Sequence, residues 1–286
     1  MTQKIAVAII HGIGSQDATF ADKMIAGLHK RCGEQISADL IMRGVHWAPV
    51  LRAVEDELLS RTAAGGPQRQ GFLRRFLVEL MGDAFAYQPV RGDRTVYDTI
   101  HAVLAETLRL LAGEAGAGAP LAIIAHSLGS IIASNFIYDL QVDPFRPMIG
   151  EKTRAQMSQP PTPLEMGETL TLLYTLGSPL AIWSLRFANF GKPIRMPAPN
   201  LNQYYPLLTG EWVNFYDADD MVGFPIKTLN DQYRDTVTQD RPVNIGRILE
   251  SWNPLSHLGY WTDNDVLDPI SDALRRVWGE VNPQAS

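Results

Sequence analysis

A serine at the end of an apolar run is the residue of this chain best suited to covalent chemistry. Residues 125–129 read Ala-His-Ser-Leu-Gly, follow the apolar run at 121–125 and precede a helical pattern at about 130–140. A sharp turn between a strand and a helix exposes a serine hydroxyl, and small residues two positions before and after it let the two elements approach closely. The first small residue here is alanine where the pattern usually has glycine. We predict that Ser127 is a nucleophile; an ordinary helix N-cap is the alternative.

A nucleophilic serine needs a base that takes its proton. His257 is the only one of the six histidines that follows Ser127, and it lies in a loop at 254–261 before the last expected helix. His126 adjoins Ser127, but adjacent side chains on a sharp turn diverge, so we do not expect it to be the base. His11 ends the first expected strand, and we expect it to form hydrogen bonds that shape the following loop.

The base in turn needs an acid that orients it and stabilises its cation. Asp217, Asp219 and Asp220 all follow the expected strand at 212–216. Three carboxylates this close cannot all lie buried beside one histidine, because like charges repel. The spacing therefore leaves all three as candidates for one position.

The elements that must position these residues are strands alternating with helices. The expected strands are 5–10, 39–47, 121–125, 169–175 and 212–216, and the expected helices are 19–30, 50–58, 72–80, 96–108, 130–140 and 269–278. Continuous apolar runs are typical of strands buried on both faces, which predicts an α/β fold with a mostly parallel central sheet and helices on both faces. We expect one domain over residues 1–286, with cap-like insertions near 48–94, 141–167 and 182–209. The insertion at 141–167 is expected to be irregular and to lie over one end of the sheet.

Several short segments together resemble a known superfamily. They are His11-Gly-Ile-Gly14, the segment 125–129, Leu176-Gly-Ser-Pro179, Asp220-Met-Val and His257. This set is similar to the α/β-hydrolase superfamily, and most similar to its lipase- and esterase-like serine hydrolases. The resemblance extends from Ile5 to about Trp278 in patches, and the three insertions match nothing in it. It implies the α/β-hydrolase fold and acyl transfer through a covalent acyl-serine, but it does not identify the acyl group.

The resemblance also implies roles for individual residues. In this superfamily the nucleophile, the acid and the base follow one another in that order, which makes His257 the base. The acid usually lies on the turn after its strand and is closely followed by a valine. Asp220, with Val222 after it, fits this description better than Asp217 or Asp219.

An oxyanion hole needs two convergent backbone N–H groups. The N–H of Leu128, which follows the nucleophile, is one expected donor. The segment at 11–14 resembles the His-Gly motif of lipases, which implies Ile13 as the second donor and His11, Gly12 and Gly14 as its supporting loop. A phosphate-binding loop is the alternative for these glycines, but the third glycine of the dinucleotide fingerprint and the Walker lysine are both missing.

The segment 182–208 carries aromatic and aliphatic residues that are candidates for a substrate pocket. These are Trp183, Leu185, Phe187, Phe190 and Tyr204. They follow an expected strand at the edge of the sheet where Ser127 should emerge. We expect either an apolar acyl groove or mobile cap, or side chains that form core under an irregular loop.

Composition excludes several other classes of function. The chain has 286 residues and a formal net charge of −6, without the block of clustered Lys and Arg that nucleic-acid binding needs. Cys32 is the only cysteine, so neither an intrachain disulfide nor a thiolate metal cluster can form. The apolar run at 5–10 is too short for a signal peptide or a membrane span. We expect a soluble, cytoplasmic protein without a cofactor or a catalytic metal, and leave open a peripheral contact with a membrane.

Taken together, these residues predict a serine hydrolase that cleaves carboxylic esters of a small-molecule or lipid-like acyl substrate. A thioesterase or an amidase would use the same three residues. A non-catalytic binding protein of the same fold is the alternative from another class. The presence of serine, aspartate and histidine together argues against it, because a binding protein needs no such set.

Overall fold

The computed structural model describes residues 2–14, 16–64, 81–90, 92–142, 149–245 and 256–285. A six-stranded sheet forms its centre, and all neighbouring strands are parallel. The strands are β1 (Ile5–Ile10), β2 (Leu40–Val45), β3 (Leu121–His126), β4 (Leu170–Leu176), β5 (Glu211–Asp217) and β6 (Gln239–Val243). This confirms the predicted α/β fold class. The expected helix at 72–80 lies outside the described residues.

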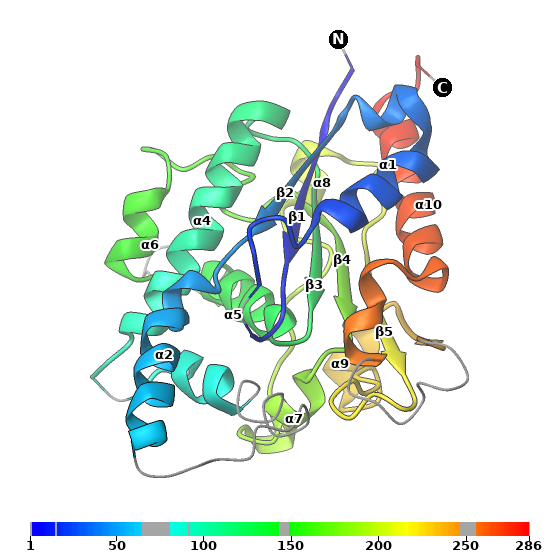
Figure 1. Cartoon of the computed structure of the whole chain (residues 1–286). Coiled ribbons are helices and arrows are strands. Elements are labelled where there is room, and N and C mark those ends of the chain that lie inside the picture. The colour runs from blue at the N-terminus through cyan, green and yellow to red at the C-terminus, as the bar shows by residue number, and fades with distance from the viewer. Residues whose placement is uncertain are drawn as a thin grey trace.

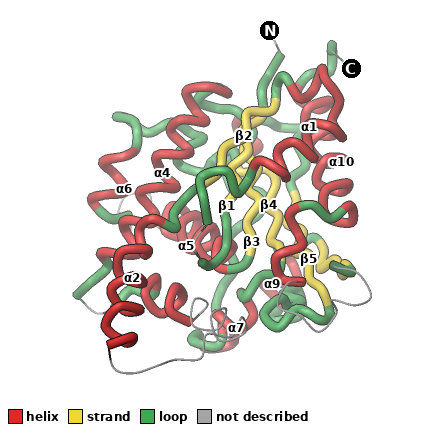
Figure 2. The backbone as a smooth tube through the Cα atoms, in the orientation of Figure 1, coloured by secondary structure: helices red, strands yellow, loops and turns green. Residues whose placement is uncertain are grey.

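Helices cover both faces of the sheet (Figure 1, Figure 2). The odd-numbered residues of β1 pack with α1 (Asp22–Ser37) and α10 (Asn264–Val281), and the even-numbered residues pack with α4 (Thr95–Ala115) and α5 (Leu128–Val142). This alternation follows from the period of two in a strand. Because both faces are covered, β1, β3 and β4 consist almost entirely of apolar residues, and all their residues are buried.

The order of the strands reverses at β1. The sheet order is β2-β1-β3-β4-β5-β6, so the chain leaves β1 toward β2 on one side and returns to β3 on the other. The loops after β1 and β3 therefore diverge at the carboxyl end of the sheet. In open parallel sheets the crevice at such a reversal is the usual place for a ligand.

Helices and short helical segments follow the strands at this carboxyl end. They are α2 (Pro49–Ala64), a helical segment at 81–87, α7 (Leu180–Ser184), α9 (Asp231–Thr236) and the 3-10 helices η1 (Ala188–Phe190) and η2 (Ser256–Trp261); α8 (Leu201–Tyr204) lies farther along the same connection. Figure 1 shows α7 and α9 at the end toward which the strands point. The expected insertions at 48–94 and 182–209 thus contain short helices.

Several elements of the structure differ from the sequence expectations. The insertion at 141–167 contains a helix, α6 (Glu151–Gln156), which packs against α4 instead of over an end of the sheet (Figure 1). Thr153 Oγ1 donates to the carbonyl oxygen of Asp98 at 3.2 Å in this contact. The strand β6 is absent from the expected set because it is short and polar and contains Pro242, which a strand tolerates at the edge of a sheet.

The helix α10 begins at Asn264, five residues before its expected start at Pro269. A proline is tolerated in the first turn of a helix, and here it lies one turn and a half inside it. Here the side chain of Asp263 caps the helix by accepting the N–H of Asp265 at 2.7 Å. This cap starts the helix ahead of the proline.

The first and last described segments meet at the amino end of the sheet (Figure 1). The backbone N–H of Gln3 donates to Asn282 Oδ1 at 2.6 Å, and Asn282 Nδ2 donates to the carbonyl oxygen of Gln3 at 3.0 Å. The side chain of Asn282 thereby pairs with the backbone just before β1 as a neighbouring strand would.

The contact between α5 and β1 leads to a stability prediction. A Cβ atom at Gly129 would lie 2.5 Å from the carbonyl oxygen of His11 and 2.9 Å from that of Ile10, whereas one at Gly113 on α4 would meet nothing within 4 Å. We expect Gly129→Ala to lower the free energy of unfolding by about 2 kcal/mol, because the backbone must shift. Gly113→Ala should raise it by up to ~1 kcal/mol through helix propensity. Urea unfolding measures both, and equal shifts would contradict the close approach.

Candidate active site

Ser127 occupies a strained turn between β3 and α5. Its φ of 51° is in the left-handed region, which non-glycine residues rarely adopt. The N–H of Ser127 donates to the carbonyl oxygen of Leu176 at the end of β4, at 2.9 Å. A Cβ atom at Gly12 would lie 2.6 Å from Ser127 Cβ, so the loop after β1 passes directly against the serine. This conformation is the one that a nucleophile elbow requires.

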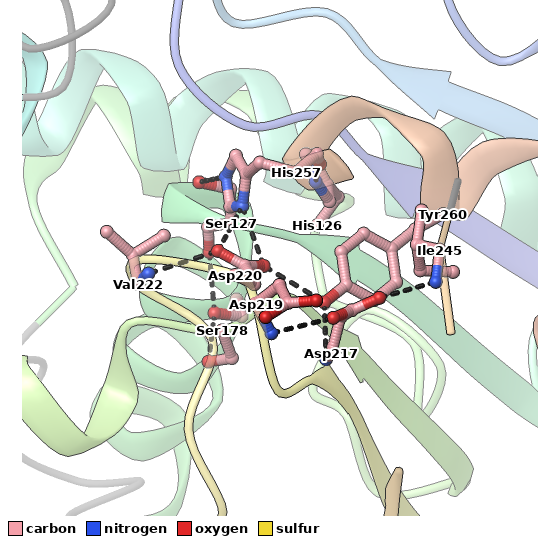
Figure 3. A network of polar contacts seen from close by, with 11 residues as sticks. His126, Ser127, Ser178, Asp217, Asp219, Asp220, Val222, Ile245, His257 and Tyr260 are labelled. Carbon is pink, nitrogen blue, oxygen red and sulfur yellow. Dashed lines mark hydrogen bonds and ion pairs between the residues drawn. The ribbon is translucent and has the colours of Figure 1, made fainter. Parts of the chain in front are cut away.

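The structure places Ser127, His257 and Asp220 in one chain of hydrogen bonds (Figure 3). Ser127 Oγ lies 2.7 Å from His257 Nε2, and His257 Nδ1 lies 2.9 Å and 3.0 Å from the two carboxylate oxygens of Asp220. All three residues are almost fully buried, with exposed fractions of 0% for Ser127, 2% for His257 and 6% for Asp220. The arrangement lets the serine hydroxyl donate to the imidazole while the imidazole donates to the carboxylate.

The carboxylate of Asp220 accepts two more hydrogen bonds. Val222 N–H donates to one oxygen at 3.0 Å, and the Tyr260 hydroxyl donates to the other at 2.9 Å. Burial alone would raise the pKa of Asp220, but the hydrogen bond and charge of His257, together with these two donors, lower it to about 2. The carboxylate is therefore ionised at neutral pH.

Tyr260 is a residue of this network that the sequence analysis did not identify. It lies three residues after His257 on the 3-10 helix η2. Because a 3-10 helix has three residues per turn, the two side chains project in the same direction and both reach Asp220. The spacing His-Leu-Gly-Tyr is the sequence signal for this arrangement. It indicates that the two side chains lie on the same side only when the segment is known to be a 3-10 helix.

The other two candidate acids have different surroundings. Asp217 accepts the N–H of Asp219 at 2.8 Å and the N–H of Ile245, while its own N–H donates to the Tyr260 hydroxyl at 2.9 Å. It therefore fixes the turn after β5. The side chain of Asp219 is exposed. Of the three carboxylates, Asp220 is the one bonded to His257.

His126 holds the backbone beside His257. Its Nε2 lies 2.6 Å from the carbonyl oxygen of His257, and because a carbonyl only accepts, this nitrogen must carry the proton. Burial, and then the charge of His257, lower the pKa of His126 to about 3, so the ring is neutral. We infer that His126 is a positioning residue, a role that its sequence neighbourhood did not suggest.

The loop after β1 is fixed by His11, whose ring is also buried and neutral. Nδ1 donates to the carbonyl oxygen of Gly12 at 2.7 Å, and Nε2 accepts the N–H groups of Trp47 at 3.1 Å and Ala48 at 3.3 Å. Burial lowers the pKa of His11 to about 3, which favours this arrangement of one donor and one acceptor. The ring also stacks on Trp47, with centroids 4.7 Å apart.

The same loop carries the second expected oxyanion donor. Ile13 follows Gly12, and none of the described residues accepts a hydrogen bond from its N–H. Gly14 N–H donates to Asp83 Oδ2 at 2.9 Å, so the helical segment at 81–87 holds the far side of the loop. The N–H of Leu128 is the first of α5, and the first N–H groups of a helix have no intrahelical acceptor. Neither expected donor thus has an acceptor among the described residues, and the loop that carries Ile13 passes against Ser127 at Gly12.

Two further serines connect Ser127 to the start of α7. Ser130 Oγ lies 2.6 Å from the carbonyl oxygen of Ser127 and 2.6 Å from Ser178 Oγ. Since the carbonyl only accepts, Ser130 donates its one proton to it and must accept a proton from Ser178. Ser178 Oγ in turn accepts the N–H of Leu180 at 3.2 Å. These groups form a one-directional chain of hydrogen bonds from α7 to the elbow.

A cavity of about 800 Å³ lies between α5, α7 and α9. Three of the five apolar residues expected to hold an acyl chain line it, namely Trp183, Phe187 and Phe190. Leu185 and Tyr204 do not line it and are exposed. Amide and hydroxyl side chains from α5 and the segment 189–192 complete the walls, so the lining is mixed rather than apolar.

The buried histidines lead to a prediction about acid stability. Burial lowers the pKa of His11, His101 and His126 from 6.5 to about 3, so the unfolded chain binds three protons near pH 5 that the folded chain does not. Burial raises the pKa of Asp139 from 3.8 to about 6, so the folded chain holds one extra proton there. The unfolded chain therefore holds two more protons than the folded chain, so the free energy of unfolding decreases by about 3 kcal/mol for each unit by which the pH is lowered near pH 5.

Urea unfolding at pH 7, 6 and 5 measures this slope. A flat free energy of unfolding between pH 6 and pH 5 would contradict the assignment of neutral buried rings. His101→Asn serves as an internal test, because it removes one of the three protons and should reduce the slope by about 1.4 kcal/mol per pH unit.

Comparison with known proteins supplies no relative from which a function can be transferred. No family model, no curated protein and no solved structure matches the chain. Within the described part of the chain, no group of three or more His, Cys, Asp or Glu is placed to hold a metal ion, and no helix has the length and apolarity needed to cross a membrane. The function must therefore be inferred from the chemistry of the protein's own side chains.

Proposed function

We propose that the protein is a serine hydrolase of the α/β-hydrolase superfamily that cleaves carboxylic esters through an acyl-serine intermediate. The observation that carries this proposal is the chain of hydrogen bonds from Asp220 through His257 to Ser127, with the serine on a strained turn. The parallel sheet and the order of the three residues along the chain support it, because nucleophile, acid and base follow one another in that superfamily.

In the first half of the proposed reaction, Ser127 Oγ attacks the carbonyl carbon of the ester. His257 Nε2 takes the hydroxyl proton as the new C–O bond forms, and the ionised Asp220 stabilises the resulting imidazolium. The N–H groups of Leu128 and Ile13 would stabilise the negative carbonyl oxygen. Collapse of the tetrahedral intermediate breaks the bond to the leaving alcohol, which receives the proton from His257. An acyl-serine and a free alcohol result.

In the second half, water replaces the alcohol. His257 Nε2 takes a proton from water as its oxygen bonds to the acyl carbon, and the same backbone donors stabilise the second oxyanion. The bond to Ser127 Oγ then breaks, and the proton on His257 returns to the serine. The products are the carboxylic acid and the free enzyme. A thioester or an amide would follow the same steps with a thiol or an amine as the leaving group.

The energetic features of the site favour an enzyme over a binding protein of the same fold. The left-handed backbone at Ser127 costs roughly 1–3 kcal/mol, and strain of this kind persists mainly at functional sites. A buried ionised carboxylate also has to be compensated by several hydrogen bonds. Strain also occurs at ligand clamps, but here both features act on one serine hydroxyl and prepare it for attack. Since the three side chains are almost fully buried, substrate entry requires the groups that cover them to move.

Labelling with a fluorophosphonate tests the role of Ser127. We expect the probe to react with the wild-type protein and the adduct to map to the peptide containing residues 125–129, because only an activated serine attacks phosphorus rapidly. Ser127→Ala should abolish both labelling and hydrolysis of p-nitrophenyl acetate while the circular dichroism spectrum is unchanged. Ser130→Ala is the matched control for a neighbouring hydroxyl and should still be labelled. Full turnover in folded Ser127→Ala would refute the proposal.

The assignment of the acid is tested by two substitutions of equal size. Asp220→Asn removes the charge beside His257 and favours the wrong imidazole tautomer, so kcat should fall by about ten-thousand-fold, as for the equivalent change in serine proteases. Asp217→Asn changes a carboxylate that accepts the backbone N–H groups of Asp219 and Ile245 and has no hydrogen bond to His257, so it should lower the melting temperature and leave kcat within about tenfold. If Asp217→Asn is the more damaging change to kcat, Asp220 is not the acid.

A further inference from the structure

The cavity between α5, α7 and α9 lies beside the proposed active site but does not include Ser127. Ser134 lines the cavity and lies on α5. It follows Ser127 by seven residues, which corresponds to ~10 Å along a helix. Leu180 lines the cavity as well, and its N–H begins the hydrogen-bonded chain that ends at the carbonyl of Ser127. The position suits a part of the substrate that is remote from the reacting carbonyl.

The lining combines aromatic faces with groups that form hydrogen bonds. Trp183, Phe187 and Phe190 contribute rings, and Asn135, Asn189 and Gln232 contribute amides. The side chains of Asn189 and Gln232 are exposed and bond to none of the described residues. An alkyl chain that filled this space would remove water from these amides and give them no partner, which is unfavourable. A saturated ring with hydroxyl groups meets both needs, because its C–H faces pack on aromatic rings while its hydroxyls bond to amides.

The loop that carries Phe190 is held in a strained shape. Asn189, Phe190 and Gly191 are three successive residues with φ of 49°, 60° and 71°. Asn230 Nδ2 fixes them by donating to the carbonyl oxygens of Asn189 at 2.8 Å and Gly191 at 3.1 Å. Ser127 is the only other non-glycine residue with positive φ in the described part of the chain. Strain retained by dedicated hydrogen bonds is characteristic of ligand clamps.

We propose that this cavity binds a polyhydroxylated ring, the chemistry of a sugar or a cyclitol. The ring stacks on the aromatic residues of the segment 182–190, and its hydroxyls bond to Asn189, Gln232 and Asn135. That this ring is the alcohol half of the ester, so that the substrate is an acylated sugar or cyclitol, rests on the proposed function. The volume of about 800 Å³ is within the range of small-ligand sites.

Binding is tested with Ser127→Ala, so that no hydrolysis occurs. The protein is labelled with ¹⁵N and titrated separately with methyl glucoside, methyl galactoside, myo-inositol and octanoate. The six tryptophans give six indole N–H signals, and the signal of Trp183 is the one that disappears in Trp183→Phe. We expect the Trp183 signal to shift on saturable binding of at least one of the ring compounds, and the signals of the buried Trp47 and Trp212 to stay in place.

Variants within the lining show whether the shift reports this cavity. Asn189→Gly keeps the left-handed backbone but removes the amide, and Gln232→Ala removes the other free amide. Each should raise the dissociation constant for the ring compound about fivefold, which is the effect of one lost hydrogen bond. Leu207→Ala is the control, because Leu207 is 90% exposed in the same insertion and does not line the cavity.

The possible outcomes separate this inference from the proposed function. No shift of Trp183 with any ring compound, or a shift with octanoate alone, overturns the inference and assigns the cavity to an acyl chain in the second case. A ring compound that binds while the wild-type protein fails to hydrolyse any ester supports the site and refutes the proposed function. If both hold, kcat/KM for the acetyl ester of the bound ring compound should exceed that for ethyl acetate, and Gln232→Ala should reduce this preference.

Discussion

The close approach of backbone segments around Ser127 is the constraint on which the other features of the site depend. The left-handed turn directs the hydroxyl toward His257, and it can form only where neighbouring segments carry no side chain. Gly12 and Gly129 supply that space on two sides, because a Cβ atom at either would overlap the turn or the end of β1. At Gly177, φ is 52° and a Cβ atom would lie 2.7 Å from Asp220 Oδ2, so the residue that packs against the acid must also lack a side chain. The loop after β1 and the end of β4 thus approach the serine turn through their main chains, and the loop after β4 approaches the acid in the same way.

The fold could be predicted to the extent that burial determines residue type. β1, β3 and β4 are covered on both faces, so they consist of apolar runs that are recognisable without any structure. The edge strand β6 and the helix α6 lack this signal. β6 has a partner on one side only, so its polar residues and proline are exposed or half-buried, and α6 is too short to show a helical period. Their positions depend on contacts with distant segments, which local patterns do not encode.

The candidate site was likewise predictable where local sequence patterns identify its residues, and not where contacts with distant segments do. Ser127, Asp220 and His257 follow from residue type, order along the chain and a resemblance, and the structure brings these three side chains together. Of the residues that hold the site in place, His11 was expected to shape its loop, whereas others were not predicted. Tyr260 and Asp83 act through tertiary hydrogen bonds whose partners are 40 and 69 residues away. The amide-lined cavity also escaped prediction, because the aromatic residues of its segment are visible in the sequence while the facing residues of α5 and α9 belong to other regions.

The pairing of Gln3 with Asn282 joins the segment before β1 to the segment after α10 at the amino end of the sheet (Figure 1). All six strands run from that end toward Ser127, so the sheet separates this pairing from the place where chemistry is proposed. A protein anchored to a carrier surface through residues next to Gln3 or Asn282 would therefore keep its reactive edge turned away from the surface and open to solvent.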